Sequence, residues 1–466
     1  MNEHVPQPKD GNVAARCKVV PDFDRLPALV IDYTLSKTKR GTEMGNERIE
    51  WVKRGGRGAD DVSKDIVDAV GEIIRDVRER GTEAVAEYSR KFDDFGGPFA
   101  VPFEEAELAL RSLPGEERVA LEEAIRNVRR FHALQREILK DREWEISPGV
   151  CAGFRYIPVD SAAVYIPGGR YPLVSSAIMC VVPAQEAGVK RIAAVSPPGR
   201  DGRIHPSVLA ALALLGVEEI WAIGGVQAIA AVALGTREIR KVDFVAGPGN
   251  AYVAEAKRAL FGEIGIDGLA GPSEVLILAD EGAVPRLIAS DMLAQSEHDP
   301  MARAVLVTTS ATLAGEVMEN LTTMLPCLPT KEVAGASWEA NGAVGIAATL
   351  DDAIAYANRF APEHLQLALA NPREALSRCT AYGAAFLGYS SSEVFGDYIA
   401  GTNHTLPTEA RAKFSSGLWT GSFMKISTHL DLTPEGADAL SGPGSLIART
   451  EGLEAHARAL LARERD

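Results

Sequence analysis

The feature that most constrains the fold of this chain is an alternation of short β-branched segments with helical segments between residues 161 and 280. We expect strands at residues 162–166, 191–195, 220–223, 242–246 and 275–278. Helical segments such as 207–215 and 251–261 lie between them. This alternation is typical of a parallel, doubly wound sheet with helices on its faces.

A second alternating stretch runs from residue 283 to residue 389, with strands expected near 304–308 and 384–387. Between residues 121 and 138, apolar side chains recur every three or four positions, which predicts a helical layer near the N-terminus. The sequence therefore predicts an α/β protein with two Rossmann-like doubly wound parallel-sheet domains, a helical N-terminal layer and a C-terminal tail.

Four parts are expected along the chain. They are a polar N-terminal extension at 1–48, a discontinuous first Rossmann-like domain at 49–150 and 273–418, a second Rossmann-like domain at 151–272, and a tail at 419–466. The helix expected at 453–462 is too short to be stable without packing elsewhere.

Composition excludes several classes of protein. The 49 Lys and Arg against 64 Asp and Glu give a net charge of −15, which argues against a nucleic-acid-binding protein. No apolar run approaches the ~18 residues that cross a bilayer, and no secretory signal is visible, so we expect a cytoplasmic protein. The 5 cysteines include no CxxC pair, which indicates free thiols and excludes a thiolate zinc site.

Glycine-rich turns follow several of the expected strands: Pro167-Gly168-Gly169, Gly224-Gly225-Val226-Gln227, Gly247-Pro248-Gly249-Asn250 and Ala270-Gly271-Pro272-Ser273. Such turns often need glycine for conformational reasons alone. Four of them in one region favour a binding crevice for an anion such as a pyrophosphate. The usual dinucleotide fingerprint is absent, because Tyr252 stands where its third glycine would be.

Gln295 and His298 are three residues apart at the end of a helical segment, so they share one face. Such a pair is more often a surface pair than a pair of metal ligands. Together with Asp397 and His456 it forms a nitrogen and oxygen donor set that suits zinc. The adjacent Glu363 and His364 could supply acid–base chemistry, because histidine titrates near neutral pH.

Five segments in order resemble the signatures of the histidinol dehydrogenase family, and the resemblance extends from about Ser63 onward. These segments are 245–253, 265–274, 294–299, 361–365 and 401–407. The family's reaction is a four-electron oxidation of an amino alcohol through the aldehyde to the carboxylate, with reduction of two NAD. The resemblance implies an NAD-dependent dehydrogenase acting on a CH–OH group of a small alcohol, with L-histidinol to L-histidine, in histidine biosynthesis, as the reference reaction.

The resemblance also implies roles for individual residues. One zinc ion per subunit would be bound by Gln295, His298, Asp397 and His456. His364 would take the alcohol proton and Glu363 would activate water. Contacts with the substrate would come from Ser273, His404 and Glu451. Contacts with the nucleotide would come from Tyr165, Gln227 and Asn250. The family forms a domain-swapped homodimer whose C-terminal tail completes the partner's site, which makes 419–466 a dimerisation tail.

Three segments differ from biosynthetic members: 419–422, 169–173 and 225–227. They look more like catabolic paralogues such as the sulfopropanediol dehydrogenase, which oxidises 2,3-dihydroxypropane-1-sulfonate to sulfolactate, or a paralogue acting on another polar diol or amino alcohol. Arg170 would suit an anion, although a surface salt bridge is at least as common a use of such a residue. His404 and the carboxylate of Glu451 instead suit the imidazole and ammonium of histidinol. A second alternative is a non-catalytic metal- or nucleotide-binding homologue, against which the intact zinc, base and nucleotide positions argue.

Overall fold

Two six-stranded sheets carry most of the chain's apolar core, and they share one strand order. In spatial order, sheet A consists of β1 (Ile49–Lys53), β12 (Ala343–Ala347), β11 (Arg303–Thr308), β10 (Glu274–Ala279), β13 (His364–Ala368) and β14 (Ala384–Leu387). Sheet B consists of β2 (Ala100–Val101), β7 (Glu219–Ala222), β6 (Arg191–Ser196), β5 (Ser161–Tyr165), β8 (Phe244–Ala246) and β9 (Gly265–Ile266). In each sheet the first edge strand is antiparallel and the other strands are parallel.

The computed structural model describes residues 48–56, 63–168 and 171–464, all within one unit, Asn46–Asp466. The expected extension 1–48, except for residue 48, and Arg170 therefore lie outside the described residues. The four described cysteines, Cys151, Cys180, Cys327 and Cys379, are free. No helix of the described residues is long and apolar enough to cross a membrane.

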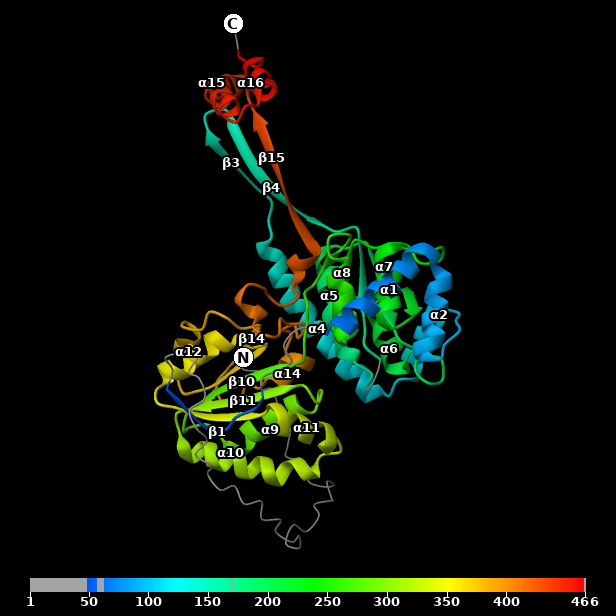
Figure 1. Cartoon of the computed structure of the whole chain (residues 1–466), viewed down its shortest axis with the longest axis vertical. Coiled ribbons are helices and arrows are strands. Elements are labelled where there is room, and N and C mark those ends of the chain that lie inside the picture. The colour runs from blue at the N-terminus through cyan, green and yellow to red at the C-terminus, as the bar shows by residue number, and fades with distance from the viewer. Residues whose placement is uncertain (1–47, 57–62, 169–170, 465–466) are drawn as a thin grey trace, which may run out of the picture. The chain divides into compact units, whose positions relative to one another are not determined.

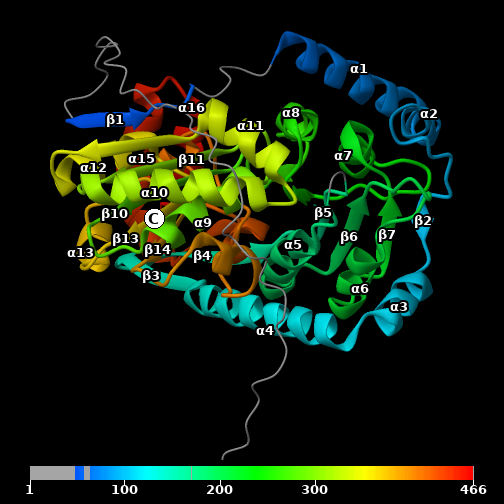
Figure 2. The same cartoon turned by 90° about the horizontal axis from the view of Figure 1, so that it is seen from below.

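Helices cover both faces of sheet B (Figure 2). Successive buried side chains along its strands point to opposite faces and pack in two separate cores. Ala162 and Val164 of β5 face α5 (Val174–Ala187) and α6 (Pro206–Leu214). Ala163 and Tyr165 face α7 (Gly225–Leu234) and α8 (Ala251–Leu260). The N-terminal helices form an outer layer on this sheet: α1 (Lys64–Arg80), α2 (Thr82–Asp93), α3 (Phe103–Ser112) and α4 (Gly115–Ile138).

Sheet A follows the same rule. Val275 and Ile277 of β10 pack on α9 (Pro285–Ser296), α10 (Ala311–Met324) and α11 (Lys331–Asn341). Leu276 and Leu278 pack on α12 (Leu350–Phe360) at the opposite face. The shorter helices α13 (Pro372–Leu376) and α14 (Glu393–Tyr398) follow β13 and β14. The predicted α/β class with parallel sheets is confirmed, while the exact domain boundaries stay a prediction.

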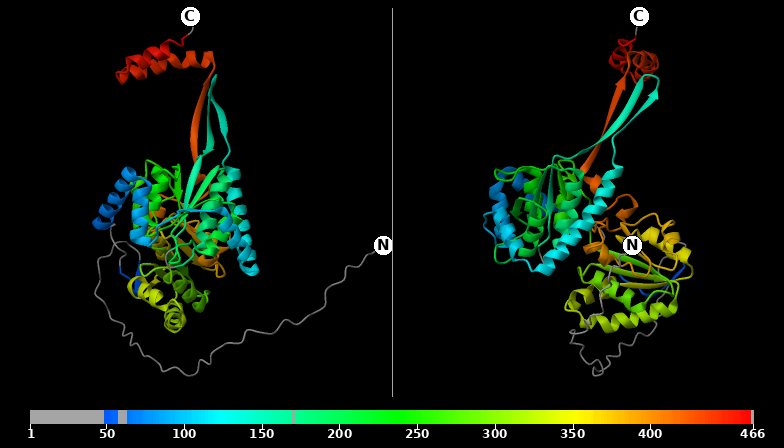
Figure 3. Two further views of the ribbon diagram at one scale, coloured as in Figure 1. Left: turned by 90° about the vertical axis from the view of Figure 1, so that its right-hand side faces the viewer. Right: turned by 180° about the vertical axis from the view of Figure 1, so that it is seen from behind.

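A third, antiparallel sheet was not expected from the sequence. It consists of β3 (Arg142–Ser147), β4 (Val150–Pro158) and β15 (Met424–Leu432), with β15 paired to β4 from Met424 to Leu432. This sheet extends away from sheets A and B and carries α15 (Pro434–Thr450) and α16 (Glu454–Leu461) at its far end (Figures 1 and 3). The tail therefore holds its helices apart from both large sheets.

Candidate active site

The Glu363–His364 pair lies at the amino end of β13, and both side chains are buried. Glu363 Oε2 accepts a hydrogen bond from the backbone N–H of Glu274 at 2.8 Å and lies 3.7 Å from His364 Nδ1. The same Nδ1 atom lies 3.3 Å from the backbone carbonyl oxygen of Glu274. The start of β10 therefore fixes both members of the pair.

Electrostatics couple the two groups. Burial raises the pKa of the Glu363 carboxyl to about 8, although the neighbouring His364 offsets part of the rise. Burial alone would lower the pKa of His364, but the carboxylates of Glu363 and Asp397 outweigh it and raise that pKa to about 10. Buried, mutually coupled titratable groups with pKa values shifted in this way are typical of acid–base residues in enzymes.

Asp397, in α14, joins this pair to the other predicted ligands. Its Oδ1 atom lies 3.3 Å from His364 Nε2, and its backbone carbonyl oxygen lies 2.9 Å from His404 Nδ1. Burial would raise the pKa of Asp397, but His364, His404 and His298 together hold it below its usual value. Gln295, the penultimate residue of α9, is 1% exposed, and His298 follows the end of that helix. The structure thus gathers these predicted residues at one edge of sheet A.

Several polar atoms of this group lack hydrogen bonds. Both amide atoms of Gln295 are buried without any partner, whereas Asp397 Oδ1 and His364 Nε2 pair only with each other, at 3.3 Å. Buried polar atoms are normally satisfied, so a bound cation would account for the orphaned amide oxygen. An amide, an imidazole and a carboxylate form a donor set that suits zinc.

No group of three or more His, Cys, Asp or Glu that could hold a metal occurs among the residues the structure describes. Of the predicted zinc ligands near sheet A, only His298 and Asp397 belong to these four residue types, since Gln295 carries an amide. The fourth predicted ligand, His456, lies in α16 at the far end of the third sheet, and Glu451 ends α15 there (Figure 1). A single chain therefore brings together the predicted residues near His364 but not these two.

Ser273, a predicted substrate contact, immediately precedes Glu274. Its backbone carbonyl accepts a hydrogen bond from the N–H of Arg303 at 2.9 Å, which holds it at the start of β10. The chain therefore places Ser273 next to the residue that supports the Glu363–His364 pair.

The predicted nucleotide contacts gather at the carboxyl edge of sheet B, where the strand order changes direction between β5 and β8. The Gly225 N–H donates to the Tyr165 hydroxyl oxygen at 3.2 Å. Gln227 is 1% exposed, its Nε2 donates to Asp93 at 3.2 Å, and its Oε1 has no partner. Asn250 caps α8 through its side-chain oxygen. This edge is where doubly wound sheets bind ligands.

A buried ion pair holds the glycine turn that follows β8. Lys257 Nζ lies 2.5 Å from Asp267 Oδ1 and donates to the Gly247 carbonyl oxygen at 2.9 Å. The other oxygen of Asp267 accepts from the Gly247 N–H at 2.8 Å. Gly247 has φ +124°, and a Cβ there would lie 2.1 Å from the Tyr165 carbonyl oxygen. Only glycine fits this close approach of two turns.

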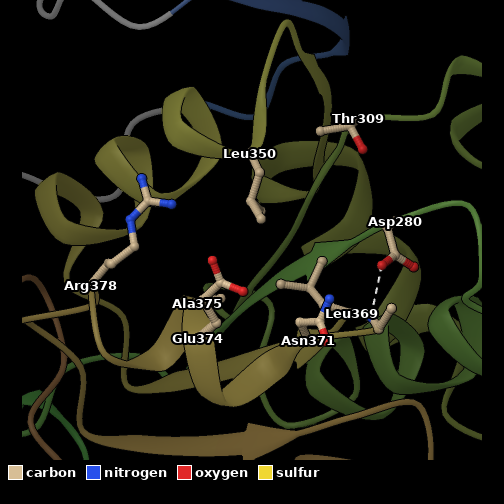
Figure 4. A pocket seen from close by; sticks show the side chains of 9 residues that line it. Asp280, Thr309, Leu350, Leu369, Asn371, Glu374, Ala375 and Arg378 are labelled. Atoms are coloured by element: carbon tan, nitrogen blue, oxygen red, sulfur yellow. Dashed lines mark hydrogen bonds between the residues drawn. The ribbon is translucent and has the colours of Figure 1, made fainter.

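A pocket at the carboxyl edge of sheet A lies away from the Glu363–His364 pair (Figure 4). It is lined by residues that follow β10 and β13, including Asp280 and Asn371, whereas His364 is at the amino end of β13. Asp280 accepts hydrogen bonds from the N–H of Ala370 at 2.7 Å and from the Tyr389 hydroxyl at 2.8 Å. The carboxylate of Asp280 is thus engaged within the chain.

Sequence reasoning did not single out Glu274, which is 1% exposed. Burial raises its pKa to about 7, although Arg303, 3.6 Å away, opposes the rise. It also did not single out Lys257, Asp267 or Glu393. The signal for Glu393 was its spacing of four residues from Asp397, which places both on one helix face.

Two doubly wound sheets with a buried carboxylate–imidazole pair at the edge of one of them define an α/β protein with an enzyme-like site. The model of the histidinol dehydrogenase family matches residues 57–464. The histidinol dehydrogenase of Zymomonas mobilis is 43% identical over 406 residues, which cover 86% of this chain and 93% of that protein. A histidinol dehydrogenase homolog of Shouchella clausii is 42% identical over 388 residues, 83% of this chain and 91% of that protein.

The crystal structure of histidinol dehydrogenase from Elizabethkingia anophelis matches this fold with a TM-score of 0.84 at 34% identity, covering 87% of this chain and 94% of that one. The chain belongs to the histidinol dehydrogenase family. Homologues in this family are NAD-dependent oxidoreductases acting on CH–OH groups, and the expectation of a dehydrogenase is confirmed.

Proposed function

We propose that this protein oxidises L-histidinol through the aldehyde to L-histidine, with two NAD as hydride acceptors and one zinc ion per subunit. The observation that carries the proposal is the buried Glu363–His364 pair, which lies beside Asp397 and the unpartnered amide of Gln295. The names and high coverage of the relatives support histidinol as the substrate.

Each residue has a task in this reaction. Zinc held by Gln295, His298, Asp397 and a second subunit's tail would act as a Lewis acid on the substrate oxygen. His364 would accept the proton of the alcohol, and NAD, when bound, would supply the hydride acceptor. Glu363 then accepts a proton from the water that adds to the aldehyde, and the Glu274 N–H keeps its carboxylate oriented for this step.

NAD would bind at the carboxyl edge of sheet B. The turn at Gly247 lets the backbone approach a pyrophosphate, and the N-terminus of α8 behind it favours an anion. The unpartnered Oε1 of Gln227 is free to accept a hydrogen bond from the cofactor. These features support Tyr165, Gln227 and Asn250 as residues of the nucleotide site.

The subunits would form a homodimer in which each tail completes the partner's site with Glu451 and His456. The third sheet carries α15 and α16 away from sheets A and B (Figure 3). Large apolar side chains of the tail helices are exposed in the single chain, among them Leu446 at 65% and Ile447 at 64%. An apolar surface of this kind is suited to a partner.

The first test is NADH formation by zinc-loaded protein with L-histidinol and, in parallel, 2,3-dihydroxypropane-1-sulfonate. Two NADH per histidinol consumed is the expected result. If the sulfonate were oxidised and histidinol were not, the proposed substrate would be wrong and the proposed reaction type would stand.

A second test addresses the swapped tail. A co-expressed mixture of His456→Ala and Glu363→Gln chains should regain activity, because one site of each mixed dimer then holds both intact residues. If each chain completed its own site, the mixture would stay as inactive as the separate variants.

A further inference from the structure

Behind the candidate active site lies a second group of polar side chains, which we call the rear cluster: Asp291, Gln366, Ser392 and Glu393. It is built on the elements that carry the active-site residues. Asp291 precedes Gln295 by one turn of α9, and Glu393 precedes Asp397 by one turn of α14. Gln366 lies two residues after His364 on the same face of β13. The rear cluster is therefore one turn behind the site.

Hydrogen bonds join the rear cluster around a single hydroxyl. Ser392 Oγ lies 2.9 Å from Asp291 Oδ1 and 3.0 Å from Glu393 Oε2. Gln366 Nε2 donates to the other oxygen of Asp291 at 2.8 Å. The Oε1 atoms of Glu393 and Gln366 are buried without a donor. The cluster thus has more acceptor oxygens than hydrogens to satisfy them.

The hydrogen count requires an additional proton. A serine hydroxyl has one hydrogen, so Ser392 can donate to Asp291 or to Glu393 but not to both. If both carboxyls were ionised, one of these two contacts would set lone pairs against each other. A protonated carboxyl removes the conflict, because it donates to Ser392, which then donates to the second carboxyl.

Glu393 is the better place for the proton. It is 1% exposed, whereas Asp291 is half-buried and receives the Gln366 amide hydrogen. Burial, together with the nearby charge of Asp291, raises the pKa of Glu393 to about 8, while His364 opposes the rise. These groups face Glu393 from α9 and β13, and Asp397 lies one turn along its own helix.

We propose that Glu393 holds a proton which it shares with Asp291 through Ser392. The shared proton limits the negative charge of the rear cluster to one carboxylate, so that Ser392 meets one donor and one acceptor. This arrangement does not depend on the proposed function.

Infrared spectroscopy of the full-length protein tests the shared proton without any substrate. The wild-type minus Glu393→Gln difference spectrum at pH 7 should contain the band of one protonated carboxyl. In Asp291→Asn that band should disappear at a pH about one unit lower, because the like charge is gone. Glu374→Gln, which changes an exposed carboxylate of α13, should leave the protonated-carboxyl region unchanged.

The inference is overturned if the Glu393→Gln difference lacks the band, or if Asp291→Asn leaves its midpoint unchanged. The second variant decides the matter should Glu393→Gln fail to fold by circular dichroism. A protein inert toward histidinol would refute the proposed function and leave the infrared result standing.

Discussion

Replacing Lys257 with methionine tests whether a buried ion pair holds the glycine turn of the nucleotide crevice. Lys257 and Asp267 are each 2% exposed, and together they bond both the carbonyl and the N–H of Gly247. Methionine fills a similar volume, so the change removes the ammonium and leaves most of the packing intact. The carboxylate of Asp267 then stays buried without its counter-charge.

The expected loss in the free energy of unfolding can be calculated from these contacts. Removing one partner of a buried ion pair costs about 3–5 kcal/mol, because an uncompensated charge remains. Asp267 keeps the N–H of Gly247 at 2.8 Å, so the lower end, about 3 kcal/mol, is expected. The double variant Lys257→Met/Asp267→Leu should cost less than the sum of the single variants by about 1–3 kcal/mol. The coupling arises because the double variant buries no unpaired charge.

The assay is urea unfolding at pH 7, combined with steady-state kinetics. The KM for NAD of Lys257→Met should rise about tenfold with little change in the KM for the alcohol, because the loosened turn lies in the nucleotide crevice. Arg191→Met is the matched control, since Arg191 pairs with Glu219 at 2.7 Å at the opposite, amino edge of sheet B. A destabilisation of Lys257→Met below about 1 kcal/mol, or additive single effects, would refute the reasoning.

Four further predictions follow from the structure. His364→Asn should slow the first oxidation, whereas Glu363→Gln should mainly slow aldehyde turnover; normal aldehyde turnover in the latter would exclude its role with water. Gly247→Ala should lower the free energy of unfolding by about 3 kcal/mol in urea, because a Cβ meets a backbone oxygen. A chain ending at Thr433 should bind no zinc by metal analysis, and normal zinc content would remove His456 from the ligand set. The Glu393 carboxyl has a pKa of about 8 in the fold and about 4.3 when unfolded, so the native state retains a proton that the unfolded chain has lost. The contribution of Glu393 to stability should therefore fall between about pH 5 and 8, by at most about 1.4 kcal/mol per unit, and urea midpoints of Glu393→Gln should fall less steeply with pH than those of the wild type.

The parallel sheets were predictable because their strands are buried on both faces and read as continuous apolar runs. The strand expected at 191–195 is β6, Arg191–Ser196, and the helix expected at 251–261 is α8, Ala251–Leu260. The third sheet was not predictable in this way. β3 carries charged residues at three of its six positions and is almost wholly exposed, so no buried stripe marks it as a strand. Its pairing with the distant β15 is a tertiary contact that no local pattern encodes.

The residues of the candidate site also fall into those that a local sequence pattern indicates and those that only the tertiary structure reveals. Gln295, Asp397 and the Glu363–His364 pair could be proposed because ligand-type residues in short motifs stand out in a sequence. Glu274 could not, because a carboxylate beside an apolar segment looks like an ordinary surface residue until the fold buries it, and Glu393 carried only its spacing from Asp397 as a signal. Their shifted pKa values come from burial and from neighbours that are distant in sequence. Such pKa shifts can therefore be recognised only when the packing of the chain is known.

The segment between Ile266 and Glu274 explains why the two edges can act as one site. β9 ends at Ile266 in sheet B, and β10 begins at Glu274 in sheet A. At the start of this connector Asp267 fixes the Gly247 turn, and at its end the Glu274 N–H fixes Glu363. One short segment therefore positions both the turn at the proposed NAD site and the acid–base pair. Hydride transfer needs the two reactants aligned to within a fraction of an ångström, and a connector anchored at both ends limits the freedom that would spoil this alignment.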